Sequence, residues 1–239
     1  YVFMATSNGT VKKTPLVDFS RPRTSGLIAI ELEEGNTLVG AAVTNGASDV
    51  MLFQSGGRAI RFKEQDVRAM GRTARGVRGI KLPANTEVIS LIIPNPEGMI
   101  LLASQNGYGK LTEVSQFSTI GRGGQGVIAI KISERNGALV GASQVESVDE
   151  VLLISDQGTM VRTRVQEVSM QGRNTQGVRL INVGEDEHLV GMARIEDPVD
   201  SEVSDESSVD GEESESDSSA AVIANDPSSG LDSELPADE

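Results

Sequence analysis

The sequence contains no cysteine and no tryptophan, a single histidine and only 3% aromatic residues among its 239 residues. Without thiols it can form no disulfide framework, no thiolate metal site and no cysteine nucleophile, and this composition is typical of a reducing compartment. No apolar run approaches the roughly 18–20 residues that cross a bilayer, and the N-terminus does not resemble a signal peptide. With 26 glycines available for turns, the composition favours short strands over an aromatic small-molecule pocket and predicts a cytoplasmic protein without a membrane partner.

The charge divides the chain into two segments. All 21 lysines and arginines lie between Lys12 and Arg194, whereas 16 of the 35 acidic residues lie from Glu196 onward. Residues 1–195 therefore carry a net charge of +2 and are long enough for a folded domain, while residues 196–239 carry −16. The second segment mixes its acids with 11 serines and has too few apolar residues to fold. We predict a folded region over residues 1–195 and a disordered, acidic, serine-rich tail over residues 196–239.

Glycines mark an internal repeat of about fifty residues. Hairpin-type turns centre on Gly9, Gly57, Gly107 and Gly158, at spacings of 48, 50 and 51 residues. A second series keeps the same period at Gly26, Gly76, Gly126 and Gly177. A third marker follows as Val39-Gly40, Ile89-Ser90, Val140-Gly141 and Val190-Gly191. Three markers with one period predict four repeats, at about residues 1–48, 49–97, 98–148 and 149–195.

Each repeat contains four short β-favouring runs: one before the hairpin turn, one after it, one after the second glycine and one at the third marker. The run after the second glycine covers residues 27–32, 77–82, 127–132 and 178–183. Asn8-Gly9 and Asn106-Gly107 are typical of tight hairpins in which both central residues have positive φ. Alternation predicts that Ile128 and Ile130 share one strand face, with Ala129 on the other.

A four-stranded unit of fifty residues has too little core to be stable alone. The alternative, a string of independent β modules, is therefore disfavoured. We predict an all-β fold, a β-pinwheel in which about four propeller-like, four-stranded blades stack around an axis.

Basic residues recur in phase with the repeats, after each hairpin glycine and around each second glycine. The second position lies in the glycine-rich loops GRTARGV at 71–77, GRGGQGV at 121–127 and GRNTQGV at 172–178. Guanidinium groups beside exposed backbone N–H groups suit phosphate oxygens. Cations also protect strand edges, which is the ordinary explanation for any one of them. As a set, they predict sequence-independent binding of double-stranded DNA along the blade rims. The predicted DNA-binding residues are Lys12, Lys13, Arg21, Arg23, Arg61, Lys63, Arg72, Arg75, Arg78, Lys110, Arg122, Lys131, Arg162, Arg164, Arg173 and Arg179.

Several of these segments resemble a known family. They include Val11-Lys12-Lys13-Thr14, Arg61-Phe62-Lys63-Glu64, Gln105-Asn106-Gly107-Tyr108-Gly109-Lys110 and Gly172-Arg173-Asn174-Thr175-Gln176-Gly177-Val178. The pattern resembles the C-terminal domain of the DNA gyrase A protein, part of a type IIA DNA topoisomerase. The resemblance implies a β-pinwheel that wraps DNA and supports ATP-dependent negative supercoiling in a bacterial, cytoplasmic, chromosome-associated enzyme. It implies as partners the remainder of the gyrase A protein and the gyrase B protein in a heterotetramer, with no cofactor in this chain because ATP and magnesium belong to other parts.

The chain departs from that family at one end. The family's wheel has about six blades and a first-blade box of the form QRRGGKG, and this sequence contains no such box. We therefore expect a fragment that lacks the first blade or blades and the catalytic N-terminal region. DNA binding is a safer expectation for it than independent DNA wrapping.

Other chemistry finds little support in the sequence. Gly121, Gly123 and Gly126 satisfy GxGxxG, but a strand is predicted after them where a dinucleotide site needs a helix. Tyr1 and Tyr108 stand at a terminus and in a turn without an acidic metal cluster, so we predict no catalytic residue. Two alternatives remain open: the related domain of the topoisomerase IV A protein, and a propeller-like protein-interaction scaffold. We also expect the acidic tail to compete with DNA for the basic rim, because tethering raises its effective concentration.

Overall fold

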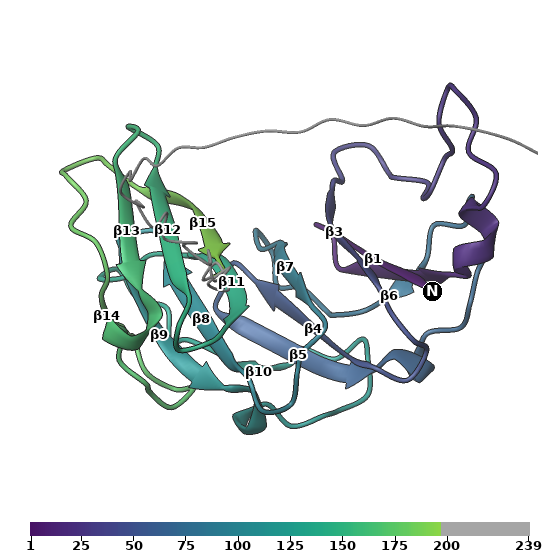
Figure 1. The fold of residues 1–239 in the computed structure, drawn as a ribbon. Coiled ribbons are helices and arrows are strands. Elements are labelled where there is room, and N and C mark those ends of the chain that lie inside the picture. The colour runs from purple at the N-terminus through teal and green to yellow at the C-terminus, as the bar shows by residue number, and fades with distance from the viewer. Residues whose placement is uncertain (197–239) are drawn as a thin grey trace, which may run out of the picture. The chain divides into compact units, whose positions relative to one another are not determined.

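The computed structural model describes residues 1–196, and the predicted tail from residue 197 onward lies outside them. The described residues form fifteen strands in four antiparallel sheets, which are the predicted blades (Figure 1). Blade 1, in the order β3-β1-β2-β6, contains β1 (Val2–Thr6), β2 (Thr10–Thr14), β3 (Leu38–Val43) and β6 (Val77–Arg78). Blade 2, in the order β10-β5-β4-β7, contains β4 (Asp49–Gln54), β5 (Arg58–Lys63), β7 (Val88–Ile92) and β10 (Val127–Ile128). The predicted all-β, bladed architecture is confirmed.

The other two blades follow the same plan. Blade 3, in the order β11-β8-β9-β14, contains β8 (Met99–Ser104), β9 (Tyr108–Glu113), β11 (Leu139–Val145) and β14 (Val178–Arg179). Blade 4, in the order β13-β12-β15, contains β12 (Glu150–Ser155), β13 (Met160–Arg164) and β15 (Leu189–Ile195). Short 3-10 helices follow the hairpins: η1 (Leu16–Phe19), η2 (Glu64–Asp66), η3 (Val114–Gln116) and η4 (Val165–Glu167).

The fourth strand of a blade comes from the next repeat. Strands β6, β10 and β14, which follow the second glycines, pair with β2, β5 and β9 of the preceding repeat. The prediction of four strands per repeat placed this strand in the blade of its own repeat, which is wrong. Residues 27–32 form no strand, because no preceding hairpin among the described residues pairs with them. In the same way, β13 has no outer neighbour among the described residues, so blade 4 has three strands.

The hairpin turns differ in type from the prediction. Gly9, Gly57, Gly107 and Gly158 all have φ between 78° and 86°, but Asn8 and Asn106 do not have positive φ. The amide of each glycine donates to the carbonyl three residues before it, for example Gly107 N to Ser104 O at 2.9 Å. This is a type I turn followed by one left-handed residue, which requires glycine at a single position.

The inner strands of the four blades are β3, β7, β11 and β15. The third sequence marker is the site of a β-bulge in each of them. In blade 1 the partner of Ala5 is Gly40 and that of Thr6 is Leu38, so the intervening residue is unpaired. The register shifts at the equivalent place in the other three blades. A bulge bends its strand and increases the twist, and here it recurs with the repeat.

The outer strands β6, β10 and β14 are shorter than predicted. β10 ends at Ile128, and the chain then bends so that the amides of Ala129 and Ile130 both donate to the carbonyl of Gly57. Consequently Ile130 is buried and Ile128 is 36% exposed. The prediction that these two isoleucines share a face is wrong because the alternating strand does not continue past Ile128.

The hydrophobic core lies between successive blades. Phe53 of blade 2 packs edge-on against Phe117, which follows η3 of the next repeat, with ring centroids 5.9 Å apart. Phe3 of blade 1 and Phe62 of blade 2 approach to 6.4 Å. The inner strands β3, β7, β11 and β15 contact one another in that order. Because each blade buries its apolar faces against its neighbours, the blades form one stack rather than independent modules.

Candidate nucleic-acid interface

Three of the predicted DNA contacts are buried lysines. Lys12 and Lys110 have no exposed surface and Lys13 is 6% exposed. The Lys110 ammonium donates to the carbonyls of Gly172 and Arg173, both at 2.6 Å, and to the Thr175 hydroxyl at 3.1 Å. Burial, and next the charge of Arg173, lowers the pKa of Lys110 from 10.5 to about 8. Lys110 therefore holds the 172–178 loop from below.

Lys12 has the equivalent role in blade 1, where it holds the first loop and the 71–77 loop. Its ammonium donates to the carbonyls of Ala29, at 2.7 Å, and Arg72. Lys13 donates to the carbonyl of Glu64 at 3.2 Å, and its ammonium lies 4.9 Å from the centre of the Tyr1 ring. The prediction that Lys12, Lys13 and Lys110 contact DNA is corrected. Their ammonium groups are covered by the chain and donate to its backbone carbonyls.

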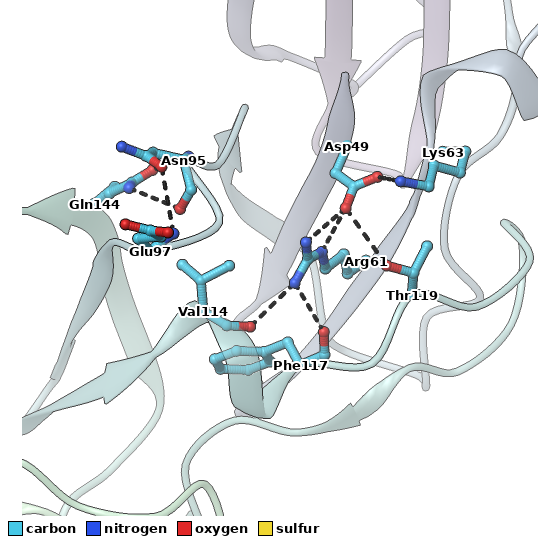
Figure 2. A network of polar contacts seen from close by, with 9 residues as sticks. All are labelled: Asp49, Arg61, Lys63, Asn95, Glu97, Val114, Phe117, Thr119 and Gln144. Atoms are coloured by element: carbon cyan, nitrogen blue, oxygen red, sulfur yellow. Dashed lines mark hydrogen bonds and ion pairs between the residues drawn. The ribbon is translucent and has the colours of Figure 1, made fainter. Parts of the chain in front are cut away.

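Arg61 joins blade 2 to the next repeat. Its guanidinium pairs with the Asp49 carboxylate at 2.6 Å and donates to the carbonyls of Val114 and Phe117, both at 3.2 Å (Figure 2). The Lys63 ammonium contacts the other Asp49 oxygen at 2.6 Å. Burial alone would raise the pKa of Asp49, but the two cations outweigh burial and lower that pKa.

Blade 4 repeats this arrangement nearer to solvent. Glu150 stands at the position of Asp49, and it pairs with Arg162 and Arg164. The side chains of Arg162 and Arg164 are more than 60% exposed, whereas that of Arg61 is 12% exposed. In both blades the first residue of the hairpin offsets the charge of the cations that follow the turn.

The second residue of each glycine-rich loop braces the loop against the previous repeat. Arg72 donates to the carbonyl of Ile28 at 3.0 Å, and Arg173 donates to that of Ile128 at 2.9 Å. Arg122 donates to the carbonyl of Arg78 at 3.0 Å and also to that of Asp66 at 2.8 Å. The period that sequence analysis detected in these arginines is thus a structural period as well as a charge pattern.

The remaining predicted cations lie on the surface. Arg75 pairs with Glu31 at 2.9 Å and lies 3.8 Å from Glu33. Arg21 and Arg23 are exposed in the first loop, and Arg23 lines an open pocket of about 510 Å³ together with Arg72. Arg78, Lys131 and Arg179 are exposed on or just after the outer strands.

A smaller set of cations is exposed and is not offset by a neighbouring carboxylate. Within residues 1–196 these exposed cations have no ion-pair partner: Arg21, Arg23, Arg68, Arg78, Lys81, Arg122, Lys131, Arg135 and Arg179. The prediction omitted Arg68, Lys81 and Arg135. Lys81 was detectable, because it stands five residues after its second glycine, as Lys131 does.

One position carries an arginine in every complete blade. The second residue of the outer strand pairs with the first residue of the hairpin's return strand, giving Arg78 with Thr10, Ile128 with Arg58, and Arg179 with Tyr108. The arginine comes from either strand, so it moves between two sequence positions that are neighbours in the sheet. For this reason Arg58 was absent from the predicted DNA-binding residues. The half-exposed Arg58 also donates to the carbonyls of Gln125 and Gly126 at 3.1 and 2.8 Å.

The loops and outer strands of successive repeats lie against each other. The amide of Lys81 donates to the carbonyl of Gly124, and that of Lys131 donates to the carbonyl of Thr175, both at 2.8 Å. These contacts bring Arg78 and Lys81 of repeat 2 close to Arg122 of repeat 3. They likewise bring Lys131 of repeat 3 close to Arg173 of repeat 4. Exposed guanidinium and ammonium groups of successive repeats therefore follow one another along the rim, an arrangement that suits successive phosphate groups.

Neither a cluster of metal-ligating side chains nor a helix that could span a membrane occurs within residues 1–196. No three His, Cys, Asp or Glu side chains within residues 1–196 converge as metal ligands would. None of the helices in the same part of the chain is long and apolar enough to cross a membrane.

Comparison with known proteins points to one family. The profile of the family described as DNA gyrase C-terminal domain, beta-propeller, matches residues 1–45, 48–95, 98–146 and 149–196. The chain is 61% identical over 198 residues to the DNA gyrase A protein of Pseudomonas aeruginosa, covering 83% of this chain and 22% of that protein. It is 55% identical over 223 residues to the DNA gyrase A protein of Salmonella typhimurium, covering 93% of this chain and 25% of that protein. The chain thus spans about a quarter of the length of these relatives.

Solved structures share the fold. A structure of the DNA gyrase A C-terminal domain superposes with a TM-score of 0.72 at 28% identity, covering 81% of this chain and 65% of that one. The C-terminal domain of DNA topoisomerase IV superposes with a TM-score of 0.77 at 24% identity, covering 82% and 62%. At that identity the second likeness concerns the fold alone.

Proposed function

The chain belongs to the DNA gyrase C-terminal domain family, and we propose that it binds double-stranded DNA along the blade rims without sequence preference. The observation that carries this proposal is the set of exposed cations without an ion-pair partner within residues 1–196, on or just after the outer strands and in the loops and turns between strands. Phosphate-led binding needs such cations and does not need a helix or ribbon that reads base edges. The interface of this proposal consists of Arg21, Arg23, Arg68, Arg78, Lys81, Arg122, Lys131, Arg135 and Arg179, with Arg58, Arg72 and Arg173 half-exposed beside them.

The stacked blades also support a role in bending DNA. Bending a site of 20–30 bp through 40–90° costs about 1–6 kcal/mol, and contacts on several blades must offset that cost together. Arg61 and the loop arginines hold neighbouring repeats in register, so the blades can act as one surface. We propose that the domain wraps DNA as a non-catalytic, cofactor-free part of the gyrase A protein, together with the gyrase B protein. Negative supercoiling on the bacterial chromosome in the cytoplasm then belongs to the assembled enzyme.

The related domain of the topoisomerase IV A protein is the nearest alternative. The chain is 61% and 55% identical to two gyrase A proteins, but only 24% identical to the solved topoisomerase IV domain. The sequence comparison favours gyrase. A protein-interaction scaffold would bind DNA weakly and without dependence on the rim cations.

Replacing three unpaired rim cations is expected to weaken DNA binding uniformly. In the variant Arg78→Gln/Lys81→Gln/Lys131→Gln, each lost phosphate contact reduces the magnitude of the log–log salt slope by about 0.9, so the slope falls by nearly three for a random-sequence duplex. Fluorescence anisotropy across a salt series on several unrelated duplexes measures it.

The matched control removes three cations that carboxylates already offset. Lys63→Gln/Arg162→Gln/Arg164→Gln changes the net charge equally, but Asp49 and Glu150 lie beside those cations. We expect a clearly smaller change in slope. An equal change in both variants would contradict a specific rim, and no binding by the unsubstituted chain at low salt would reject the proposed function.

Deletion of the acidic tail is expected to tighten DNA binding at low salt. Residues 197–239 lie outside the described residues, and the expectation rests on their charge alone. Tethered acids compete at an effective concentration that reaches the millimolar range for short flexible tethers. Anisotropy titrations of the complete chain and of residues 1–196 measure the difference, which should vanish at high salt. Equal affinities at low salt would reject competition.

A further inference from the structure

Blade 3 differs from the other blades at the arginine position described above. Arg179 stands opposite Tyr108, whose equivalents in blades 1 and 2 are Thr10 and Arg58. The Arg179 guanidinium donates to the Tyr108 hydroxyl at 2.8 Å, and its central carbon lies 5.3 Å from the ring centroid. A second guanidinium, that of Arg135, lies 4.7 Å from the same centroid. Two cations therefore converge on one phenol.

The surrounding chain holds both cations in place. The Asn106 side-chain amide donates to the carbonyls of Glu134 and Arg135, at 3.0 and 3.2 Å, and so positions the loop that carries Arg135. Arg179 also donates to the Asn182 side chain at 3.0 Å. Tyr108 itself is 6% exposed. The aromatic ring thus acts as a buried support on which two exposed guanidinium groups rest.

The charge at this place is not balanced by ion pairs. Within residues 1–196 neither Arg135 nor Arg179 lies within ion-pair distance of a carboxylate. The nearby acids are Asp186 and Glu187, which line the same pocket with His188. The carboxylate of Glu187 is occupied by the Gly184 amide at 2.7 Å and by the Ser155 hydroxyl. Two guanidinium groups held together with no carboxylate within ion-pair distance favour an anion between them.

The pocket itself has room for a phosphate group. It measures about 280 Å³ and is lined by Asn106, Tyr108, Arg135, Arg179, Val183, Gly184, Asp186, Glu187 and His188. Arg179 follows the second glycine on the outer strand, at the same place as Arg78 two repeats earlier. The pocket therefore continues the line of rim cations instead of forming a separate surface.

We propose that Arg135 and Arg179, supported by Tyr108, form an anchor site for one backbone phosphate of bound DNA. This proposal rests on the proposed function and adds to it a place where the duplex is held more firmly than at the single arginines of blades 1 and 2. Two guanidinium groups can offer several N–H donors to the oxygens of one phosphate, whereas one arginine offers a single fork.

Tyr108 supplies a direct readout of the site. The chain has two tyrosines and no tryptophan, so in a Tyr1→Phe background Tyr108 is the only tyrosine. The neighbouring guanidinium groups of Arg135 and Arg179 lower the pKa of its phenol. A phosphate bound to them would offset their charge, and the ring ¹³C resonances of Tyr108 should shift and saturate together with DNA binding measured by anisotropy.

The binding test uses the full chain and a random-sequence duplex. We expect Arg135→Gln/Arg179→Gln to reduce the magnitude of the salt slope by nearly two and the affinity at least about tenfold, because two phosphate contacts are lost. The matched control Arg162→Gln/Arg164→Gln removes two cations that pair with Glu150 and should change both quantities less. If Arg179 is replaced by lysine in place of glutamine, part of the salt slope should be kept, because Arg179→Lys keeps the charge without the fork.

The outcomes separate this inference from the proposed function. If the unsubstituted chain binds DNA but the Tyr108 resonances and the double variant's slope are unchanged, the anchor is overturned while the proposed function stands. If the chain binds no DNA, both fail. If inorganic phosphate alone shifts the resonances and the duplex does not, the pocket is a free-anion site and the DNA anchor is overturned. A shift with the duplex that Arg135→Gln/Arg179→Gln abolishes supports the proposal.

Discussion

Replacing Asp49 by alanine is expected to lower the free energy of unfolding by about 3 kcal/mol, because it leaves the nearly buried Arg61 guanidinium without its carboxylate. Arg61 also holds the carbonyls of Val114 and Phe117 (Figure 2). An unpaired guanidinium is more stable when it is solvated, so Arg61 would move toward solvent and loosen the contact between blade 2 and η3. Urea unfolding of the full chain, followed by far-ultraviolet circular dichroism, measures the loss.

Blade 4 provides the control for this variant. Glu150 has the same place and the same kind of partners as Asp49, but the Arg162 and Arg164 side chains are more than 60% exposed. Glu150→Ala should cost at most about 1 kcal/mol, since solvent screens exposed pairs. The double variant Asp49→Ala/Arg61→Met should recover part of the loss by removing the unpaired charge. Equal costs for Asp49→Ala and Glu150→Ala would contradict a buried interblade ion pair.

The pH dependence of the same pair has a defined sign. The pKa of Asp49 is lower in the folded protein than its ordinary value of 3.8. Its contribution to stability is therefore present above the unfolded-state pKa and is lost as the pH falls through the lowered, folded-state pKa. The difference in stability between the unsubstituted chain and Asp49→Ala should shrink in this acid range.

The second large effect is expected for Gly107→Ala. Gly107 has φ of +78°, and an added Cβ would lie 2.4 Å from the carbonyl oxygen of Ile181. The strained backbone costs roughly 1–2 kcal/mol, and the overlap with a neighbouring backbone costs about 1–3 kcal/mol more. The clash falls on the residues after β14, whose amides donate to the carbonyl of Gly107. We expect the outer strand of blade 3 to shift and unfolding to require less urea.

Gly158→Ala is the matched control for this change. Gly158 occupies the same place in the blade 4 hairpin with φ of +86°, and nothing lies within 4 Å of an added Cβ. It should show only the backbone cost of roughly 1–2 kcal/mol. The difference between the two variants measures how tightly an outer strand sits on the hairpin of the preceding repeat. Indistinguishable midpoints would mean that the outer strand does not pack there.

Local patterns made much of the fold predictable. Gly9, Gly57, Gly107 and Gly158 do turn hairpins, and the third marker coincides with a strand in each repeat. The turn type was wrong because Asn-Gly permits more than one turn, and only the glycine takes positive φ here. The length of the third run was also wrong, because the bend after Ile128 depends on hydrogen bonds to Gly57 of another repeat.

The interface was predicted less well than the fold. Lys12 and Lys110 share the period and residue type of exposed cations, yet each donates to loop carbonyls about sixty residues away. Arg58 and Arg78 lie at different places in the repeat sequence, but these two places pair with each other across neighbouring strands of the sheet. Tyr108 begins β9 and Arg135 lies in a later turn of repeat 3, and both meet Arg179 of repeat 4 only in space. A repeat period reports where cations recur but not which of them retain solvent.

The sequence by itself determined the number of repeats, their hairpins and the all-β class, because glycine turns and alternating apolar residues act over a few neighbouring positions. Only the tertiary structure decided which repeat completes which blade, since β6, β10 and β14 are two residues long and find their partners through contacts across repeats. The tertiary structure also decided which cations are buried, paired or exposed. The buried lysines are covered by loops about sixty residues away in the sequence, and no local pattern encodes that contact.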